Sequence, residues 1–348
     1  MWNNPSSKIN RALALLGVVA ILSLASEAVE GAGSAREIKE APSPRISEVP
    51  QATVVSPTPS SVLSSEEAEL RSWCTQLRKA VSSLNWKLYP CRDLSWKVGG
   101  KSIQGRPLVY LEMGAPDATN TTLVFSMVHG DEVTPLFLGL QLAHWLRENQ
   151  RELAKTRVVI APLVNPDSFF RSPRTRMNAR GVDVNRNFAT HDWGSKALAL
   201  WRKKFRSDPR RFPGSQPESE PETLFQLKLI RDFKPQKILS IHAPLNFLDY
   251  DGPSTLSLDK FPRTYVQECM KLRSRLKAIS GGFFPGSLGN YAGHELGIPT
   301  LTLELPSADA RKAERYWNQF SKGIRAMIEF SVPTFALRKA SETSTPRM

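Results

Sequence analysis

The chain alternates between short, nearly continuous apolar runs and longer segments in which apolar residues recur at helical spacing. The apolar runs are rich in β-branched residues and span residues 108–111, 122–128, 158–163, 238–241 and 300–305. The helical segments span residues 134–148, 221–233, 265–279 and 308–331. Buried strands separated by helices are typical of a sheet that helices cover on both faces. The pattern predicts an α/β fold, a three-layer α/β/α arrangement with a central mixed, largely parallel sheet.

This periodic pattern is confined to residues 66–333, which we expect to form one folded domain. Residues 29–65 are rich in Pro, Ser, Ala, Val and Glu and have no helical or alternating period. Because they carry too little bulky apolar surface to offset the entropy of ordering, we expect a flexible linker there. Residues 334–348 are expected to be a frayed tail.

The first 28 residues have the three parts of a secretory signal. Lys8 and Arg11 precede an uncharged, apolar stretch from Ala12 to Ala25, and small residues follow as far as Ala28. The stretch is 14 residues long, shorter than the roughly 20 residues that a membrane-spanning helix needs. We therefore expect a signal peptide over 1–28, export to the periplasm or medium, and no stable membrane insertion after its removal.

Composition limits the class of protein and suggests an anionic partner. The 348 residues are 41% hydrophobic and 23% charged, which excludes a fully disordered chain and a bundle of membrane spans. Lys and Arg number 47 against 33 Asp and Glu, a net charge of +14. This excess suits nucleic acid, an anionic lipid surface or a cell-wall polymer, and does not choose among them.

The three cysteines leave two interpretations open. Cys74 and Cys91 lie close in sequence, and an oxidising compartment would let them form a disulfide, with Cys269 unpaired. The alternative is three unpaired, buried thiols.

Candidate chemistry follows two of the apolar runs. His129 and His242 each come directly after a predicted buried strand, and Glu132 follows His129 at a spacing that places both side chains on one side of a helical turn. Two imidazoles and a carboxylate form the ligand set of a catalytic zinc site that leaves a fourth position for water.

A third strand ends in a carboxylate. Glu304 lies in the apolar run 300–305, where an ionisable group is costly to bury without a partner. A general base beside a metal site would explain it. The alternative is a structural carboxylate that pairs with an arginine.

The segment between the two histidines is rich in arginine. Its arginines alternate with Asn and Gly, and its apolar residues do not recur at helical spacing. The arginines are Arg171, Arg174, Arg176, Arg180 and Arg186. Such a loop suits carboxylate binding through paired donors. A solvated charged surface is the alternative, whereas nucleic-acid binding is disfavoured because no aromatic residues are interleaved to stack on bases.

Five motifs in this order resemble the zinc carboxypeptidases of the carboxypeptidase A type. They are His129-x-x-Glu132, Asn165-Pro166-Asp167, Gly-Val-Asp-x-Asn-Arg-Asn at 181–187, Ser240-Ile241-His242 and Leu303-Glu304-Leu305. The resemblance covers residues 97–331. Within the family, the short insertions and the segments 242–245 and 248–253 are similar to the murein peptide amidases, which cleave the γ-D-glutamyl–diaminopimelate bond of peptidoglycan peptides.

The resemblance implies a role for each matching residue. It implies one zinc ion per chain, held by His129, Glu132 and His242. It implies Glu304 as general base, with Arg176 polarising the scissile carbonyl and Arg174 as the alternative for that role. Finally, it implies that Asn185 and Arg186 hold the substrate's terminal carboxylate, and that Asp183 orients the first zinc histidine.

The sequence departs from the digestive carboxypeptidases near the expected pocket. Residues 280–289 contain no tyrosine to match their mobile one, Tyr291 does not fall at its place, and the pocket-floor position is at or near Gly289. A bulky apolar C-terminal residue is therefore disfavoured, and a charged one such as diaminopimelate is easier to accept.

We therefore expect an exported zinc metallopeptidase, a monomer, that hydrolyses the γ-D-glutamyl–diaminopimelate bond of a peptidoglycan-derived peptide and binds no nucleic acid. The alternatives are a zinc carboxypeptidase for ordinary L-peptides, a deacylase of amino acids, and a non-catalytic cell-wall-binding module.

Overall fold

A computed structural model describes residues 64–253, 256, 260–264, 277–278 and 284–333. The chain divides after Ser60, and all the described residues belong to its C-terminal unit. The predicted signal peptide, nearly all of the predicted linker, the predicted tail and Cys269 lie outside the described residues, so these expectations stay predictions.

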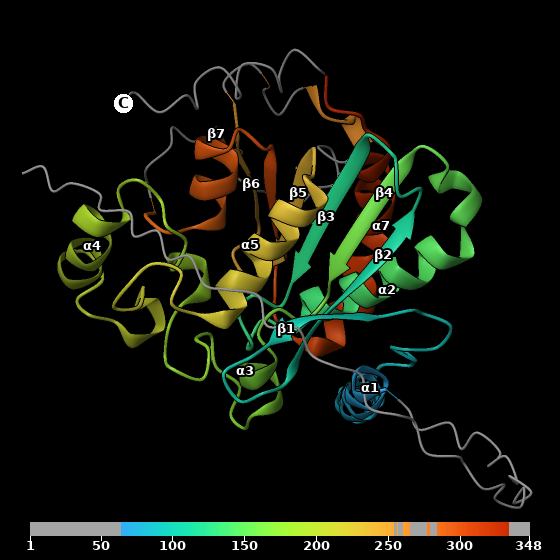
Figure 1. Ribbon diagram of the computed structural model, residues 1–348, viewed down its shortest axis with the longest axis horizontal. Helices are drawn as coiled ribbons and strands as arrows, with labels where there is room; N and C mark the ends of the chain where they lie inside the picture. The colour runs from blue at the N-terminus through green and yellow to red at the C-terminus, as the bar shows by residue number, and fades with distance from the viewer. Residues whose placement is uncertain (1–63, 254–255, 257–259, 265–276, 279–283, 334–348) are drawn as a thin grey trace, which may run out of the picture. The chain divides into compact units, whose positions relative to one another are not determined.

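The fold is built on an eight-stranded sheet in the order β1-β2-β4-β3-β5-β8-β6-β7 (Figure 1). Its strands are β1 (Lys97–Lys101), β2 (Pro107–Gly114), β3 (Asn120–Ser126), β4 (Thr156–Ala161), β5 (Lys237–His242), β6 (Phe247–Asp251), β7 (Lys277–Ala278) and β8 (Thr300–Glu304). The four central strands β4, β3, β5 and β8 run parallel, while the β1–β2, β2–β4 and β6–β8 pairs are antiparallel. The prediction of a central mixed, largely parallel sheet is confirmed.

Helices cover both faces of the sheet. The described α-helices are α1 (Ser65–Ser83), α2 (Thr134–Glu148), α3 (Pro166–Phe170), α4 (Leu198–Lys203), α5 (Pro221–Phe233) and α7 (Ala313–Glu329). In Figure 1, α5 lies on one face, and α2 and α7 lie on the other. The predicted three-layer arrangement is confirmed.

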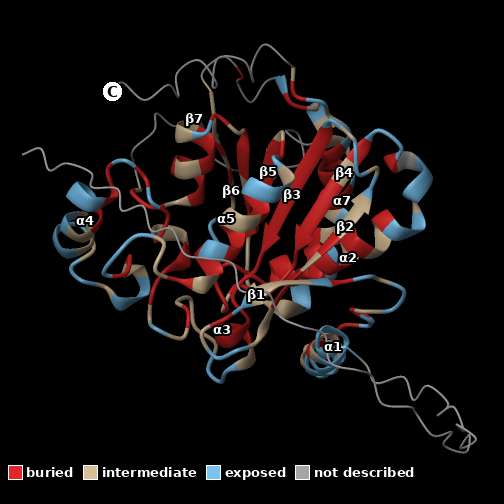
Figure 2. Cartoon of the chain, viewed as in Figure 1, coloured by how far each residue is buried: buried red, intermediate tan, exposed pale blue. Residues whose placement is uncertain are grey.

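Two hydrophobic clusters, one on each side of the sheet, explain why the central strands carry apolar residues at successive positions. Val124 of β3 belongs to the cluster that contains α2 and α7, whereas Leu123 and Phe125 belong to the cluster that contains α5. Successive side chains of a strand point to opposite faces, so a strand covered on both faces carries a nearly continuous apolar run. Figure 2 shows β3 and β5 buried along their length.

An N-terminal helix is attached to this domain by a disulfide. Helix α1 begins with a capping box in which Ser64 and Glu67 satisfy each other's backbone N–H groups. Its buried face carries Trp73 and Leu77. Cys74 on this helix is bonded to Cys91, so the paired interpretation of these two cysteines is confirmed. Among the described helices, none combines the length and the apolar character that a membrane crossing requires.

The structure corrects the prediction in two helical segments and adds strands. Most of the predicted helix 265–279 lies outside the described residues, and its described part, Lys277–Ala278, pairs with β6 as a strand. The predicted helix 308–331 begins only at Ala313, after a 3₁₀ turn, η7, at Ala310–Lys312 that Asp309 caps. Strands β1 and β6 were not predicted, because they are short and partly exposed, with Gly, Lys or Asp interrupting the apolar pattern.

Candidate active site

The predicted metal ligands meet at the carboxyl edge of the parallel strands. His129 and Glu132 lie in the loop after β3, and His242 is the last residue of β5. This edge is where open α/β sheets bind ligands. The loop packs so tightly on α3 that a Cβ added at Gly130 would lie 2.4 Å from the Ser168 side chain.

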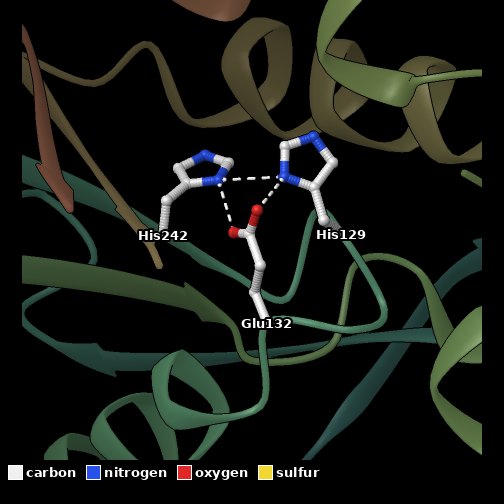
Figure 3. Close-up of side chains that lie close together, drawn as sticks. All are labelled: His129, Glu132 and His242. Atoms are coloured by element: carbon white, nitrogen blue, oxygen red, sulfur yellow. Dashed lines mark hydrogen bonds and ion pairs between the residues drawn. The ribbon is translucent and has the colours of Figure 1, made fainter. Parts of the chain in front are cut away.

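The three side chains point toward one another (Figure 3). Nδ1 of His129 lies 2.8 Å from Oε1 of Glu132, and Nδ1 of His242 lies 3.0 Å from Oε2 of the same carboxylate. All three residues are buried, and one ligand atom from each lies within 4.8 Å of the others. Two imidazole nitrogens and one carboxylate oxygen, converging in this way, fit a catalytic zinc ion.

The other nitrogen of each imidazole has its own partner. Nε2 of His129 lies 3.0 Å from Oδ1 of Asp183, and Nε2 of His242 lies 2.9 Å from the hydroxyl of Ser240. Such partners fix the orientation of a metal-binding imidazole and leave the opposite nitrogen facing the metal. The structure thus places Asp183 where the sequence analysis expected it and adds Ser240, whose signal was its position two residues before His242.

Of the two arginines considered for the carbonyl-polarising role, Arg176 lies beside this cluster. Its Nε donates to Asp183 at 3.0 Å and its Nη1 donates to Glu132 at 3.1 Å. Arg174 instead donates to the carbonyl of Phe169 and stacks on that ring at 4.9 Å. The alternative assignment of the role to Arg174 is therefore not supported by the geometry.

The surroundings shift the pKa values of the two carboxylates Glu132 and Glu304 in opposite directions. Burial favours protonation of Glu132, but the adjacent His129 and His242 outweigh it and hold the pKa of Glu132 well below its usual range. Burial raises the pKa of Glu304 to about 7, and the nearby Glu132 carboxylate acts in the same direction. Glu304 is thus poised to exchange a proton near neutral pH.

Asn185 and Arg186 line a cavity of about 500 Å³ that also contains the metal cluster and Glu304. The loop is fixed because Asp183 accepts a hydrogen bond from the Asn185 backbone N–H at 3.1 Å. Oδ1 of Asn185 accepts from the Leu288 N–H, so its amide nitrogen remains the donor for a ligand. Nε of Arg186 is buried and has no hydrogen-bond partner among the described residues.

Strand β6 contributes two carboxylates and one aromatic ring to the lining of the cavity. Phe247, Asp249 and Asp251 of β6 line it, while the alternate residues of this strand are buried in the core. A Cβ at Gly289 would lie only 2.0 Å from Oδ2 of Asp251, so a side chain there would displace this carboxylate. Asp251 also lies 2.9 Å from Nε2 of His294.

The arginine loop is divided by the fold. Arg176 and Arg186 line the active-site cavity, but Arg171 and Arg174 line a separate one, and Arg180 is exposed and donates to the carbonyl of Ser219. Two other arginines, Arg210 and Arg211, line the active-site cavity from the 3₁₀ turn η4 (Pro209–Arg211). The sequence analysis missed them, and their only signal was Asp-Pro-Arg-Arg at residues 208–211.

Residues 91–318 match the model of the zinc carboxypeptidase family of peptidases. The chain belongs to this family. The resemblance found in the sequence is thereby confirmed, and the protein is a hydrolase of the metallocarboxypeptidase type.

Known members of the zinc carboxypeptidase family resemble the chain in sequence and in fold. Murein peptide amidase A of Vibrio campbellii is 30% identical over 215 residues, 61% of this chain and 79% of the relative. Murein peptide amidase A of Escherichia coli K12 is 30% identical over 222 residues, 62% of this chain and 84% of the relative. The crystal structure of the carboxypeptidase A from Helicoverpa armigera covers 80% of this chain and 74% of its own, with 21% identity and a TM-score of 0.54, which shows a shared fold.

Proposed function

We propose that the protein is an exported zinc-dependent murein peptide amidase that hydrolyses the γ-D-glutamyl–diaminopimelate bond of peptidoglycan stem peptides. The observation that carries this proposal is one cavity that joins the His129–Glu132–His242 cluster to Glu304, to the arginines Arg176 and Arg186, and to the two carboxylates of β6. The similarity to two murein peptide amidases supports it.

His129, Glu132 and His242 would hold one zinc ion per chain, which supplies Lewis-acid polarisation of a carbonyl and a lowered pKa for water. Glu304 would take the proton from the attacking water and deliver it to the leaving amine, since its raised pKa suits both steps. Arg176, held by Asp183 and Glu132, would place positive charge where the carbonyl oxygen becomes negative.

The terminal carboxylate of the substrate would bind to Arg186 and Asn185. Both residues line the cavity, and because the Asn185 oxygen already accepts from the Leu288 N–H, its amide nitrogen and the Arg186 guanidinium are the donors that such a carboxylate needs. Placing the carboxylate there fixes the scissile amide relative to Glu304, and fixed geometry of this kind lowers the entropic barrier to reaction.

The wall of the cavity supports a substrate side chain with an ammonium group. Asp249 and Asp251 alternate with buried residues on β6 and so face the same cavity, and the Asp251 carboxylate can take its place there because Gly289 has no side chain. Diaminopimelate carries an ammonium at the far end of its side chain, whereas a terminal Phe or Leu would put apolar surface against carboxylates.

Export is supported by the signal pattern of residues 1–28 and by the Cys74–Cys91 disulfide. Disulfides persist in oxidising compartments such as the periplasm and are rare in the cytosol. These compartments are also where peptidoglycan lies.

The test offers the purified protein two substrates side by side, the wall tripeptide that ends in diaminopimelate and a peptide that ends in Phe or Leu. We expect faster cleavage of the wall tripeptide, with mass spectrometry locating the cut at the γ-D-glutamyl bond. Faster cleavage of the Phe or Leu peptide would reject the amidase and leave a carboxypeptidase for ordinary L-peptides. Specific binding to sacculi without any cleavage would favour the wall-binding module.

A further inference from the structure

The turn η4 brings Arg211 to the active-site cavity. Its neighbour Arg210 donates to Asp131 at 2.8 Å and is thereby neutralised. Arg211 has only a long ion pair, 3.7 Å from its Nε to Oδ2 of Asp208, which exceeds hydrogen-bond distance. Among the described residues its guanidinium donates no hydrogen bond to a protein acceptor, so its five N–H donors remain for a ligand.

An aromatic pair holds Arg211 and Arg186. The guanidinium of Arg186 lies over the Phe284 ring at 4.4 Å, and that of Arg211 lies over the Phe205 ring at 4.7 Å. The two rings stack on each other with an interplanar angle of 16°. Stacking fixes the plane of a guanidinium, and Nη1 of Arg186 also donates to the Asn185 carbonyl, so both arginines are oriented before any ligand binds.

Arg186 is repelled by two other arginines that line this cavity. Burial lowers the pKa of Arg186 to about 10, and although Asp183 opposes this, repulsion from Arg176 and Arg211 adds to it. Asp183 itself already accepts hydrogen bonds from His129 and Arg176. One ligand carboxylate at Arg186 would leave Arg211 with only its long ion pair to Asp208, whereas a ligand with two carboxylates would give each arginine a hydrogen-bonded partner.

We propose that Arg211 binds a second carboxylate of the substrate, in addition to the terminal one that Arg186 and Asn185 bind. The inference rests on the proposed function and narrows its substrate class to peptides with two carboxylates near the scissile bond. A γ-glutamyl–diaminopimelate peptide has two sources of this second group, namely the α-carboxylate of the glutamate and the far carboxylate of the diaminopimelate. Either presents the same chemistry to a guanidinium.

The experiment compares three peptides with the zinc-loaded enzyme and its Arg211→Gln variant. The peptides are the wall tripeptide, the same tripeptide with the glutamate α-carboxylate amidated, and the same tripeptide with the far diaminopimelate carboxylate amidated. We expect Arg211→Gln to raise KM for the parent about tenfold or more with little change in kcat, the effect of losing a charged hydrogen bond. One amidated peptide should show equal KM with both enzymes, and that peptide identifies the carboxylate that Arg211 binds.

The control is Arg202→Gln, which removes the same charge from an exposed position on α4 and should leave all three KM values unchanged. An equal rise in KM for all three peptides, or none, would overturn the proposal and leave the amidase function intact. An equal effect of Arg202→Gln would overturn it too, since long-range attraction would then explain the data.

Failure of the proposed function itself is distinguishable. If the wild type cleaves none of the peptides, calorimetric titration of the zinc-loaded Glu304→Gln protein, with and without Arg211→Gln, gives a readout that does not need turnover. The inference would be supported if Arg211→Gln weakened binding of the parent peptide but left the binding of one amidated peptide unchanged. Equal binding by the two proteins, or none, would reject it.

Discussion

His242 and Glu304 are paired neighbours at the carboxyl ends of the parallel strands β5 and β8. Adjacent strands lie about 4.8 Å apart, so the imidazole and the carboxylate leave the same edge of the sheet side by side. On the other side of Glu304, β6 contributes Phe247 as its antiparallel partner. A shift of the β5–β8 pairing by one residue would turn either side chain to the opposite face, so the register of the sheet sets the geometry of this site.

The metal assignment predicts zinc content. His129→Ala and His242→Ala should each abolish stoichiometric zinc, because two remaining protein ligands are too few to hold the ion. Elemental analysis of the purified variants measures this. His144→Ala is the matched control, since His144 lies on α2 and contacts the carbonyl of Tyr89. Full zinc in both ligand variants would contradict the assignment.

Ser240 is expected to act through His242. Ser240→Ala removes the hydroxyl 2.9 Å from Nε2 of this histidine and should weaken zinc binding about tenfold, the lower end for partners of metal ligands. Competition against a chromophoric chelator gives the dissociation constant. The control Ser321→Ala, at a buried serine of α7, should leave the zinc dissociation constant unchanged. If Ser240→Ala also left this constant unchanged, the Ser240 hydroxyl would not be what orients the His242 ring.

Glu304→Gln should lower turnover by about 10²-fold or more, which is the scale of positioned acid–base catalysis. Zinc content should be retained, because Glu304 is not in the ligand cluster. Steady-state kinetics measures the effect. The control is Glu314→Gln, which makes the same change at an exposed position on α7. Near-normal turnover in Glu304→Gln would place the base elsewhere.

Arg186→Ala should raise KM about 10- to 100-fold with a smaller effect on kcat, because the terminal carboxylate loses its charged donor. Arg180→Ala is the control from the same loop, since Arg180 is exposed and lies outside the cavity. Initial rates over a range of substrate concentrations separate the two constants. A similar KM in Arg186→Ala and the wild type would mean that the carboxylate binds elsewhere.

Glu222 predicts a pH dependence of stability. Burial raises its pKa to about 7, although Asn178 donates to it at 2.9 Å and opposes the shift. Because the folded pKa lies above the unfolded value, the stabilisation is complete below about pH 4.5 and is lost as pH rises through 7. Glu222→Gln should remove this loss, which is of order 3 kcal/mol.

Urea unfolding at pH 5 and pH 8 measures the Glu222 effect. The fall in the free energy of unfolding between these pH values should be smaller in Glu222→Gln than in the wild type. Glu148→Gln, at an exposed position near the end of α2, should behave as the wild type does. An identical fall in all three proteins would show that Glu222 does not titrate in this range.

The sequence by itself determined the central strands, the helices α2 and α5, and the residues of the metal cluster. A strand buried on both faces carries a nearly continuous apolar run, and a helix on a sheet carries apolar residues at helical spacing, so these elements leave a local pattern. Polar residues directly after such strands could be placed at one edge of the sheet, which is why His129, His242 and Glu304 were found.

Only the tertiary structure decided which arginines face the cavity. Arg174 and Arg176 are two residues apart and look alike in the sequence, but one stacks on Phe169 and the other donates to Asp183. Arg211 comes from a turn with no periodic pattern, and Asp251 acquires its place only when Gly289 packs against it. Such positions depend on contacts between segments far apart in the chain, and no local pattern of hydrophobic and polar residues encodes those contacts.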